Sequence, residues 1–266
     1  MWRIQEIGSS ITVECNGLTI TVYQTDPSLS LPYFYPVRAL SGEEVCAIGP
    51  QHLYPHHRSV WIGHGNVNGV SFWLDRPGEG QIRHEQTETI TNSEFTVRSL
   101  WISPDGTALM HDARSFQFRD LPEGWLMICH LTVTPLQESL VLGKTNHAFF
   151  SVRVRPEIAV TGGGKIWNSE GKEDESETMG ARARWCLYGR ELSGRFLGVA
   201  LLDAPENPWH PSPWFARDYG FLSPSPFYWQ DWTIERNEPL RLRYGLLVCH
   251  QKPDMDKIWQ IFSVGL

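Results

Sequence analysis

The sequence predicts an all-β fold in which two large antiparallel sheets pack face to face as a supersandwich, with one short helix at the C-terminal end. Three observations predict it: apolar and polar residues alternate with a period of two, turn-forming residues recur at short intervals, and helical periodicity appears only near the end. The 266 residues are within the size that such sandwiches reach as one unit, so we expect a single domain over residues 1–266.

The clearest strands are predicted at Leu18–Val22 and Leu240–Tyr244, where strict alternation places the apolar side chains on one sheet face. Five more runs are typical of strands, and several are apolar on both faces, which predicts a position between two layers. These runs are Glu94–Ile102, Trp125–Thr134, Phe149–Val154, Arg182–Tyr188 and Phe196–Asp203.

Turns and the remaining segments complete the prediction. Pro104-Asp105-Gly106 and Pro122-Glu123-Gly124 are typical turn sequences. The acidic stretch Asn168–Thr178 indicates a mobile loop rather than a metal site. Pro253–Phe262 carries apolar residues at helical spacing and predicts the C-terminal helix.

Composition excludes several classes of partner. The formal charge is −7 and no segment concentrates basic residues, which argues against nucleic acid. The apolar runs are far shorter than the ~20 residues that span a bilayer, and the N-terminus does not resemble a signal peptide. The five cysteines are scattered and form no C-x-x-C pair, which indicates a cytoplasmic location, and the four in apolar runs (Cys46, Cys129, Cys186 and Cys249) are predicted to be buried free thiols. The 12 tryptophans serve mainly as core, but such rings also bind the flat faces of sugars.

The segment Pro50–Trp73 is the first candidate site, because so many polar side chains are costly to bury. The alternative is a surface loop whose histidines bond to the backbone. A divalent metal ion is a further hypothesis: one of the neighbouring His56 and His57 would pair with His64, and a carboxylate would come from elsewhere. The polar residues of the segment are His52, His56, His57, Arg58, His64, Asn66 and Asn68, and the candidate carboxylates are Glu85, Asp112 and Asp203.

A second candidate is the proline-rich segment Leu202–Phe227, which we expect to be a rigid, irregular loop rather than a ladder strand. Its aromatic faces and planar polar groups suit sugar recognition, although structural ion pairs and capping tryptophans explain them equally well. Its polar and aromatic residues include Asp203, Asn207, Trp209, His210, Trp214, Arg217, Asp218 and Tyr219. Lys144 and Arg153 form a third candidate, with a solvated sheet edge as the alternative.

Five sequence blocks carry a resemblance to a known family. They are PYFYPVRALSG, PHHRSVWIGHGNVNGVSFW, MGARARWCLYG, GVALLDAPENPWHPSPWFARDYGFLSPSPF and LRLRYGLLVCH. In this order, over about Pro32–Phe262, the blocks resemble the bacterial family known as methane oxygenase PmoA. The resemblance implies a galactose mutarotase-like supersandwich and a role in sugar breakdown. Two departures, Phe215 in place of a His and Ser225–Tyr228 in place of N-P-F-G, imply an altered substrate or a lost catalytic step.

Three functional hypotheses follow. The first is an enzyme that transfers protons on a sugar or keto-sugar, by epimerisation or mutarotation or by β-elimination or hydration. The second is a non-catalytic carbohydrate-binding or sensing domain, and the third is a metal-dependent oxygenase. We expect one cleft to unite His57, His64 and Arg217, whereas the oligomeric state stays open. The candidate residues are His57, His64, Lys144, Arg217 and Asp203 for catalysis, Arg58, Asn68, Arg153, Trp209, Trp214 and Tyr219 for substrate binding, and His56 with His64 for metal.

Overall fold

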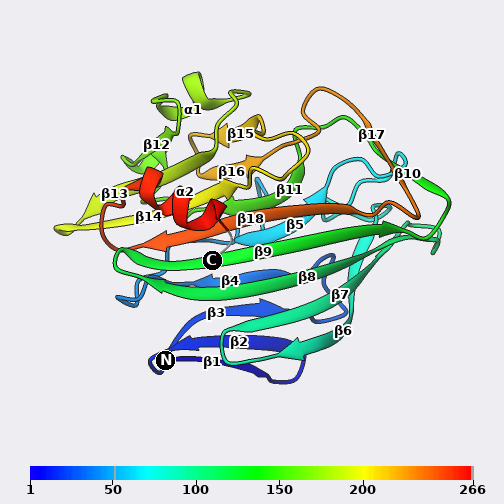
Figure 1. Ribbon diagram of the computed structural model, residues 1–266, viewed down its shortest axis with the longest axis horizontal. Coiled ribbons are helices and arrows are strands. Elements are labelled where there is room, and N and C mark those ends of the chain that lie inside the picture. Colours follow the sequence, from blue (N-terminus) through cyan, green and yellow to red (C-terminus); the bar gives the residue numbers. More distant parts are fainter. Residues whose placement is uncertain (51, 265–266) are drawn as a thin grey trace.

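The computed structural model describes residues 1–50 and 52–264 and contains two eight-stranded antiparallel sheets packed face to face (Figure 1). The first sheet has the order β1 (Trp2–Glu6), β2 (Ser10–Cys15), β3 (Leu18–Gln24), β4 (Tyr33–Val37), β5 (Val60–His64), β11 (Ala148–Arg153), β16 (Phe221–Pro224) and β15 (Trp214–Arg217). The second has the order β12 (Lys165–Asn168), β13 (Trp185–Leu192), β14 (Arg195–Asp203), β18 (Leu240–Cys249), β9 (Gly124–Pro135), β8 (Ala108–Leu121), β7 (Glu94–Ile102) and β6 (Gln81–Ile90). Strands β10 (Ser139–Leu142) and β17 (Trp232–Glu235) form a separate pair. The predicted all-β, two-sheet fold is confirmed.

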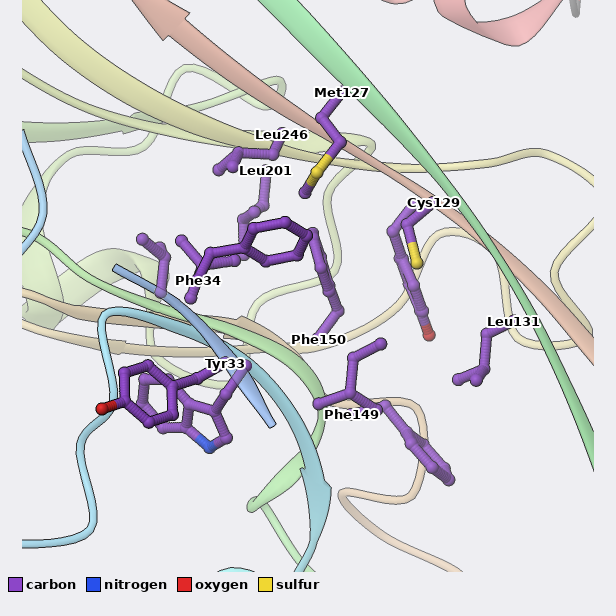
Figure 2. Packing of buried hydrophobic residues seen from close by; sticks show 14 of the residues in the cluster. Tyr33, Phe34, Met127, Cys129, Leu131, Phe149, Phe150, Leu201 and Leu246 are labelled. Carbon is purple, nitrogen blue, oxygen red and sulfur yellow. The ribbon is translucent and has the colours of Figure 1, made fainter. Parts of the chain in front are cut away.

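The core lies between the two sheets, because alternate side chains of the strands face inward. Strand β2 shows this directly, since every second residue from Ile11 to Cys15 is buried. Figure 2 shows Phe34 and Phe150 of the first sheet together with Met127 and Leu246 of the second. One apolar cluster therefore joins the sheets.

A buried ion pair interrupts this core. Arg114 donates to Asp112 at 2.5 and 2.8 Å and to the Tyr23 hydroxyl at 3.1 Å, while Trp101 Nε1 donates to Asp112 at 2.6 Å. Both charged side chains are fully buried, so these bonds offset the cost of removing them from water. The Asp112 carboxylate, one of the candidate metal ligands, is thus engaged in the core.

The helix α2 (Met255–Ser263) forms a partial third layer over the second sheet (Figure 1). Its Ile258 and Phe262 pack with Leu126 and Leu247, which face outward from β9 and β18. This explains why those strands are apolar on both faces and confirms the predicted C-terminal helix.

Two sequence predictions are wrong in detail. The acidic stretch Asn168–Thr178 is not simply a loop, because it contains the short helix α1 (Asp174–Thr178). Its carboxylates meet partners from neighbouring segments: Lys165 donates to Glu173 at 2.6 Å, and the backbone N–H of Ile166 donates to Asp174 at 3.0 Å. Composition alone does not reveal such partners.

The proline-rich segment Leu202–Phe227 is also more regular than expected, because β15 and β16 form a hairpin within it. All six of its prolines precede β15 or follow Ser223, so they remove few ladder hydrogen bonds. The strand predicted over Arg182–Tyr188 begins at Trp185 and continues to Leu192. Before it, the backbone N–H of Arg184 is bonded to the Ser169 hydroxyl at 2.8 Å.

Composition led to predictions about the cysteines and about membrane-spanning segments. All five cysteines are free and buried, which confirms the prediction for the four in apolar runs and adds Cys15. None of the helices in the described ranges has the length and apolar character needed to cross a bilayer.

Candidate functional site

The two polar segments meet at one end of the first sheet. Strand order explains this, since β5 pairs with β11, β11 with β16, and β16 with β15. The turn before β5 brings Tyr54 against Tyr219, with ring centroids 4.6 Å apart. Tyr219 lies in the β15–β16 turn, where Gly220 has φ of +109° and a Cβ would lie 3.1 Å from Val154. A glycine is therefore required at this turn.

Four side chains form a compact stack around Arg153. The Tyr54 and His57 rings are nearly parallel, at 4.9 Å and 6°, and His57 also packs against Phe221 at 5.2 Å. The guanidinium carbon of Arg153 lies 4.8 Å from the ring centre of Tyr219 and 5.4 Å from that of Tyr54. We refer to Tyr54, His57, Arg153, Tyr219 and the adjoining Arg217 as the His57 cluster.

The protonation of His57 is set by its surroundings. Burial lowers its pKa to about 2, and the charge of Arg153, together with the charges that His56 and His147 carry when protonated, acts in the same direction. His57 is therefore neutral at pH 7. Arg153 Nη1 lies 3.1 Å from His57 Nδ1, and because a guanidinium can only donate, Nδ1 is the acceptor and the ring proton resides on Nε2. His57 is thus a neutral donor with a fixed tautomer.

Arg217 joins the cluster from the other side. Its guanidinium carbon lies 5.4 Å from the Tyr219 ring centre, and its Nε is 3.1 Å from Glu175 of α1. Glu175 also accepts from the backbone N–H of Asp218 at 2.8 Å. The helix α1 therefore fixes the position of Arg217.

Two further histidines flank His57. The His56 ring meets the His57 ring edge-on at 4.6 Å, and the His147 ring lies 5.1 Å from both Trp73 and Phe215. Burial lowers the pKa of each to about 4, so both are neutral at pH 7. Phe215, which stands where the resembled family has a His, is here an apolar wall beside His147. His147 and Tyr54 were not predicted as site residues, because no motif in the sequence marks either of them.

His64 does not join His57 and Arg217. It is fully buried, its ring stacks on Phe149 at 5.1 Å, and burial lowers its pKa to about 3. Within residues 1–50 and 52–264, no hydrogen bond or ring contact links it to His57 or Arg217. Of the three residues expected in one cleft, His57 and Arg217 lie near the same ring, that of Tyr219, whereas His64 lies elsewhere.

Asp203 also lies elsewhere and is occupied. Its buried carboxylate accepts from Asn207 at 2.7 Å and from the backbone N–H of Ser212 at 2.8 Å, and it lies 3.0 Å from His210 Nδ1. These bonds brace the chain ahead of β15. The geometry is that of a structural carboxylate.

The other predicted residues are dispersed. Lys144 is exposed in the β10–β11 connection, and Asn68 accepts from the backbone N–H of Val141 at 2.8 Å. Arg58 is paired with Asp75. Trp209 is buried edge-on to Phe227, and Trp214 is fully buried and donates to Ala183 O at 2.8 Å. Among the candidates for catalysis and substrate binding, Arg153, Arg217 and Tyr219 join His57, and the metal candidate His56 flanks it.

A metal site requires several ligating side chains that face one point. Over residues 1–50 and 52–264, no group of three or more His, Cys, Asp or Glu side chains is placed to hold a metal ion. Glu85, another candidate carboxylate, lies 3.1 Å from His111. A divalent ion at His56 and His64 stays a prediction. The oxygenase hypothesis, which needs such an ion, also stays a prediction.

A cavity of about 690 Å³ lies at the turns that join β8 to β9 and β13 to β14. Its walls include Leu121, Arg195, Phe196 and His250, and none of the residues of the His57 cluster. The walls contain no stacked rings with a fixed donor comparable to His57. We therefore take the His57 cluster as the candidate site.

Comparison with known proteins gives a family and distant structural likenesses. The pattern of a family of unknown function (DUF6807) matches residues 10–263. No curated protein sequence matches the chain. Among solved structures, a galactose mutarotase-like protein from Lactobacillus casei ATCC 334 is 7% identical with a TM-score of 0.40, and the match covers 93% of this chain and 100% of that one. The Slr1438 protein from Synechocystis sp. PCC 6803 is 12% identical with a TM-score of 0.36, covering 94% and 96%. The resemblance to the PmoA family stays a prediction.

Proposed function

The chain belongs to the family of unknown function DUF6807, and we propose that it is a carbohydrate-active protein that transfers protons on a sugar or keto-sugar. The observation that carries the proposal is the contact between Arg153 and His57 Nδ1, at 3.1 Å. It holds a neutral imidazole with its proton on Nε2, ready to donate to a sugar oxygen. A neutral donor beside the Arg153 guanidinium, with Arg217 on the neighbouring Tyr219 ring, suits a reaction in which negative charge develops on that oxygen.

In this proposal a base removes the proton from the carbon beside the sugar carbonyl. The electron pair of that C–H bond moves to the carbonyl oxygen, which accepts a hydrogen bond from His57 Nε2 and is stabilised by the charge of Arg153 and Arg217. Delivery of a proton from water to the opposite face gives the epimer, and the base releases the proton that it took to water. Departure of a group from the next carbon gives the elimination product, and the reverse with water gives hydration.

His56 is the side chain that we assign as the proton acceptor. Its ring lies 4.6 Å from that of His57, and its lowered pKa of about 4 keeps it uncharged at pH 7 with a free lone pair. Tyr54 and Tyr219 stack on each other and are both half-buried, and we propose that the exposed parts of their rings contact the sugar. The cluster thus offers a donor, an acceptor and a stacking surface.

Proton exchange in D₂O tests this proposal. Purified protein is incubated with a panel of glycosides and their keto derivatives, with and without a chelator, and followed by proton NMR. We expect deuterium to enter a carbon beside the carbonyl, or the aglycone to be lost, at a rate that His57→Gln lowers by at least about 100-fold. His52→Gln, at an exposed position of the same segment, is the matched control and keeps the full rate. Equal rates in both variants would contradict the assignment.

A second candidate is a non-catalytic carbohydrate-binding domain. One observation favours it: in the described part of the chain no carboxylate is hydrogen-bonded to His57, whose one bonded side chain is Arg153. In that case the same panel gives line broadening or chemical-shift changes without deuterium exchange. Turnover therefore separates the two candidates.

We also propose a cytoplasmic location and a small-molecule carbohydrate as the partner. The five cysteines are all free and buried, which favours a reducing compartment. Fractionation of the native organism with an antibody against the protein tests the location.

A further inference from the structure

A second cavity lies where the start of α2 faces β12 and β13. Its volume is about 350 Å³, and it shares no residue with the His57 cluster. Ligand sites for small molecules are commonly of this size and are mostly apolar with a few polar groups. Its lining consists of Trp167, Asn168, Trp185, Leu187, Lys252, Pro253, Asp254, Met255 and Asp256.

Two indole rings form part of the wall, and their polar atoms are already engaged. Trp167 Nε1 donates to Glu173 at 3.2 Å, and Trp185 Nε1 lies 3.4 Å from Asp256. The carbon faces of the rings are therefore what the wall offers to a ligand. Leu187 and Met255, which are 4% and 5% exposed, add an apolar surface. Such a wall suits the C–H face of a sugar ring.

The carboxylates around the cavity are compensated within the protein, and the exposed ammonium of Lys252 lies 5.8 Å from the ring centre of Trp167. Asp256 is paired with Arg184 at 3.1 Å, and Glu173 with Lys165 at 2.6 Å. Asp254 caps α2 by accepting from the backbone N–H of Lys257 at 3.2 Å. Because these carboxylates already have partners and the Lys252 ammonium is exposed to water, none of these charges needs a counter-ion from a ligand, and the cavity favours a neutral ligand over an ion.

Asn168, one of the lining residues, has a side-chain hydrogen-bond donor without an acceptor in the described residues. Asn168 is 3% exposed, and its Oδ1 accepts from the backbone N–H groups of Glu170 and Lys172, both at 3.0 Å. Its Nδ2 is buried and, in the described residues, has no partner. A buried donor without an acceptor is costly, and a ligand hydroxyl would remove that cost.

From these observations we propose that this cavity is a second binding site, for a neutral sugar ring of hexose size. Trp167 and Trp185 contact the face of the ring, and Asn168 Nδ2 donates to one of its hydroxyls. The site does not depend on the chemistry proposed for the His57 cluster, so either can fail without the other.

Fluorine NMR of protein labelled with 5-fluorotryptophan tests the site directly. The signals of Trp167 and Trp185 are assigned with Trp167→Phe and Trp185→Phe, and methyl hexopyranosides are titrated beside the matching uronic acids and amino sugars. We expect a saturable shift of these two signals with the neutral sugars and weaker binding of the charged ones. No shift of either signal at saturating sugar, or tighter binding of a charged sugar, would overturn the proposal.

Two variants then test the roles of the residues. Asn168→Asp keeps the acceptor and removes the amide donor, and we expect it to weaken binding about tenfold. Met255→Trp fills the cavity and should abolish binding even if Asn168→Asp fails to fold. Trp229→Ala is the matched control, because Trp229 is 50% exposed and does not line the cavity. Binding that survives Met255→Trp, or that is lost in Trp229→Ala, would contradict the site.

Discussion

His57 and His64 belong to one short segment, yet their surroundings give them different tasks. The His57 ring is bonded to Arg153 and borders half-buried tyrosines, whereas the His64 ring is enclosed by Phe149 and Phe227. The bond to Arg153 fixes the tautomer of His57. We therefore interpret His64 as a core residue whose neutrality is required for folding.

The pH dependence of stability follows from this interpretation. The folded pKa of His64 is about 3, below the ordinary value of about 6.5, so between these values the unfolded chain binds a proton that the folded protein does not. Stability therefore falls as the pH drops through this window. From pH 7 to pH 5, His64 alone contributes about 2 kcal/mol to the loss. We expect His64→Phe to remove this share in urea unfolding at the two pH values, and the exposed control His52→Gln to keep it. An unchanged pH dependence in His64→Phe would contradict the burial argument.

Some individual residues of the His57 cluster could be predicted from the sequence. Residue chemistry pointed to His57, Arg153, Arg217 and Tyr219, because planar polar and aromatic groups concentrated near them. It did not separate these from His64 or Asp203, since burial and bonding partners depend on contacts that are distant in sequence. Tyr54 was missed for the same reason, because a tyrosine becomes a stacking surface only when another ring lies against it.

The contacts of Glu175 in α1 with Arg217 and Asp218 of the β15–β16 hairpin position Arg217. The pair Glu175–Arg217 is partly exposed, so its contribution to stability is at most about 1 kcal/mol. We expect Glu175→Gln to leave the melting temperature almost unchanged and to weaken sugar binding at the His57 cluster, measured by calorimetry. Glu177→Gln, at an exposed position of the same helix, is the control. Unchanged binding in Glu175→Gln would show that the helix does not position the site.

The helix α2 stabilises the second sheet. Phe262 is fully buried, with the Arg243 guanidinium 4.5 Å from its ring centre, so Phe262→Ala should lower the free energy of unfolding by about 3–5 kcal/mol. The exposed Gln260→Ala should change it by less than about 0.5 kcal/mol. Chemical denaturation checks both values. A small effect of Phe262→Ala would mean that α2 does not cover the sheet.

Alternation located the long strands well, because a half-buried strand must keep its apolar side chains on one face. Glu94–Ile102 has the predicted bounds, and Trp125–Thr134 extends by one residue at each end. The hairpin β15–β16 and the helix α1 escaped the prediction. Both are short, and both depend on partners from other segments rather than on local pattern.

At the scale of the whole molecule, the order of strands in the first sheet creates the candidate site. Strands β5, β11, β16 and β15 are neighbours, although β5 and β15 are far apart in sequence. Their turns and ends bring His57, Arg153 and Tyr219 together. The sequence predicted two sheets but not their strand order, because pairing between distant strands leaves no periodic signal.

The central claim is that His57 is a neutral donor held by Arg153 within a sugar site. Long-range nitrogen–proton NMR of protein labelled with ¹⁵N-histidine measures this tautomer with and without sugars. We predict that His57 carries its proton on Nε2 from pH 7.5 to pH 5 and that its signals move when a sugar of the panel binds. A His57 that is protonated at pH 6, that carries its proton on Nδ1, or that does not respond to any sugar would contradict the account.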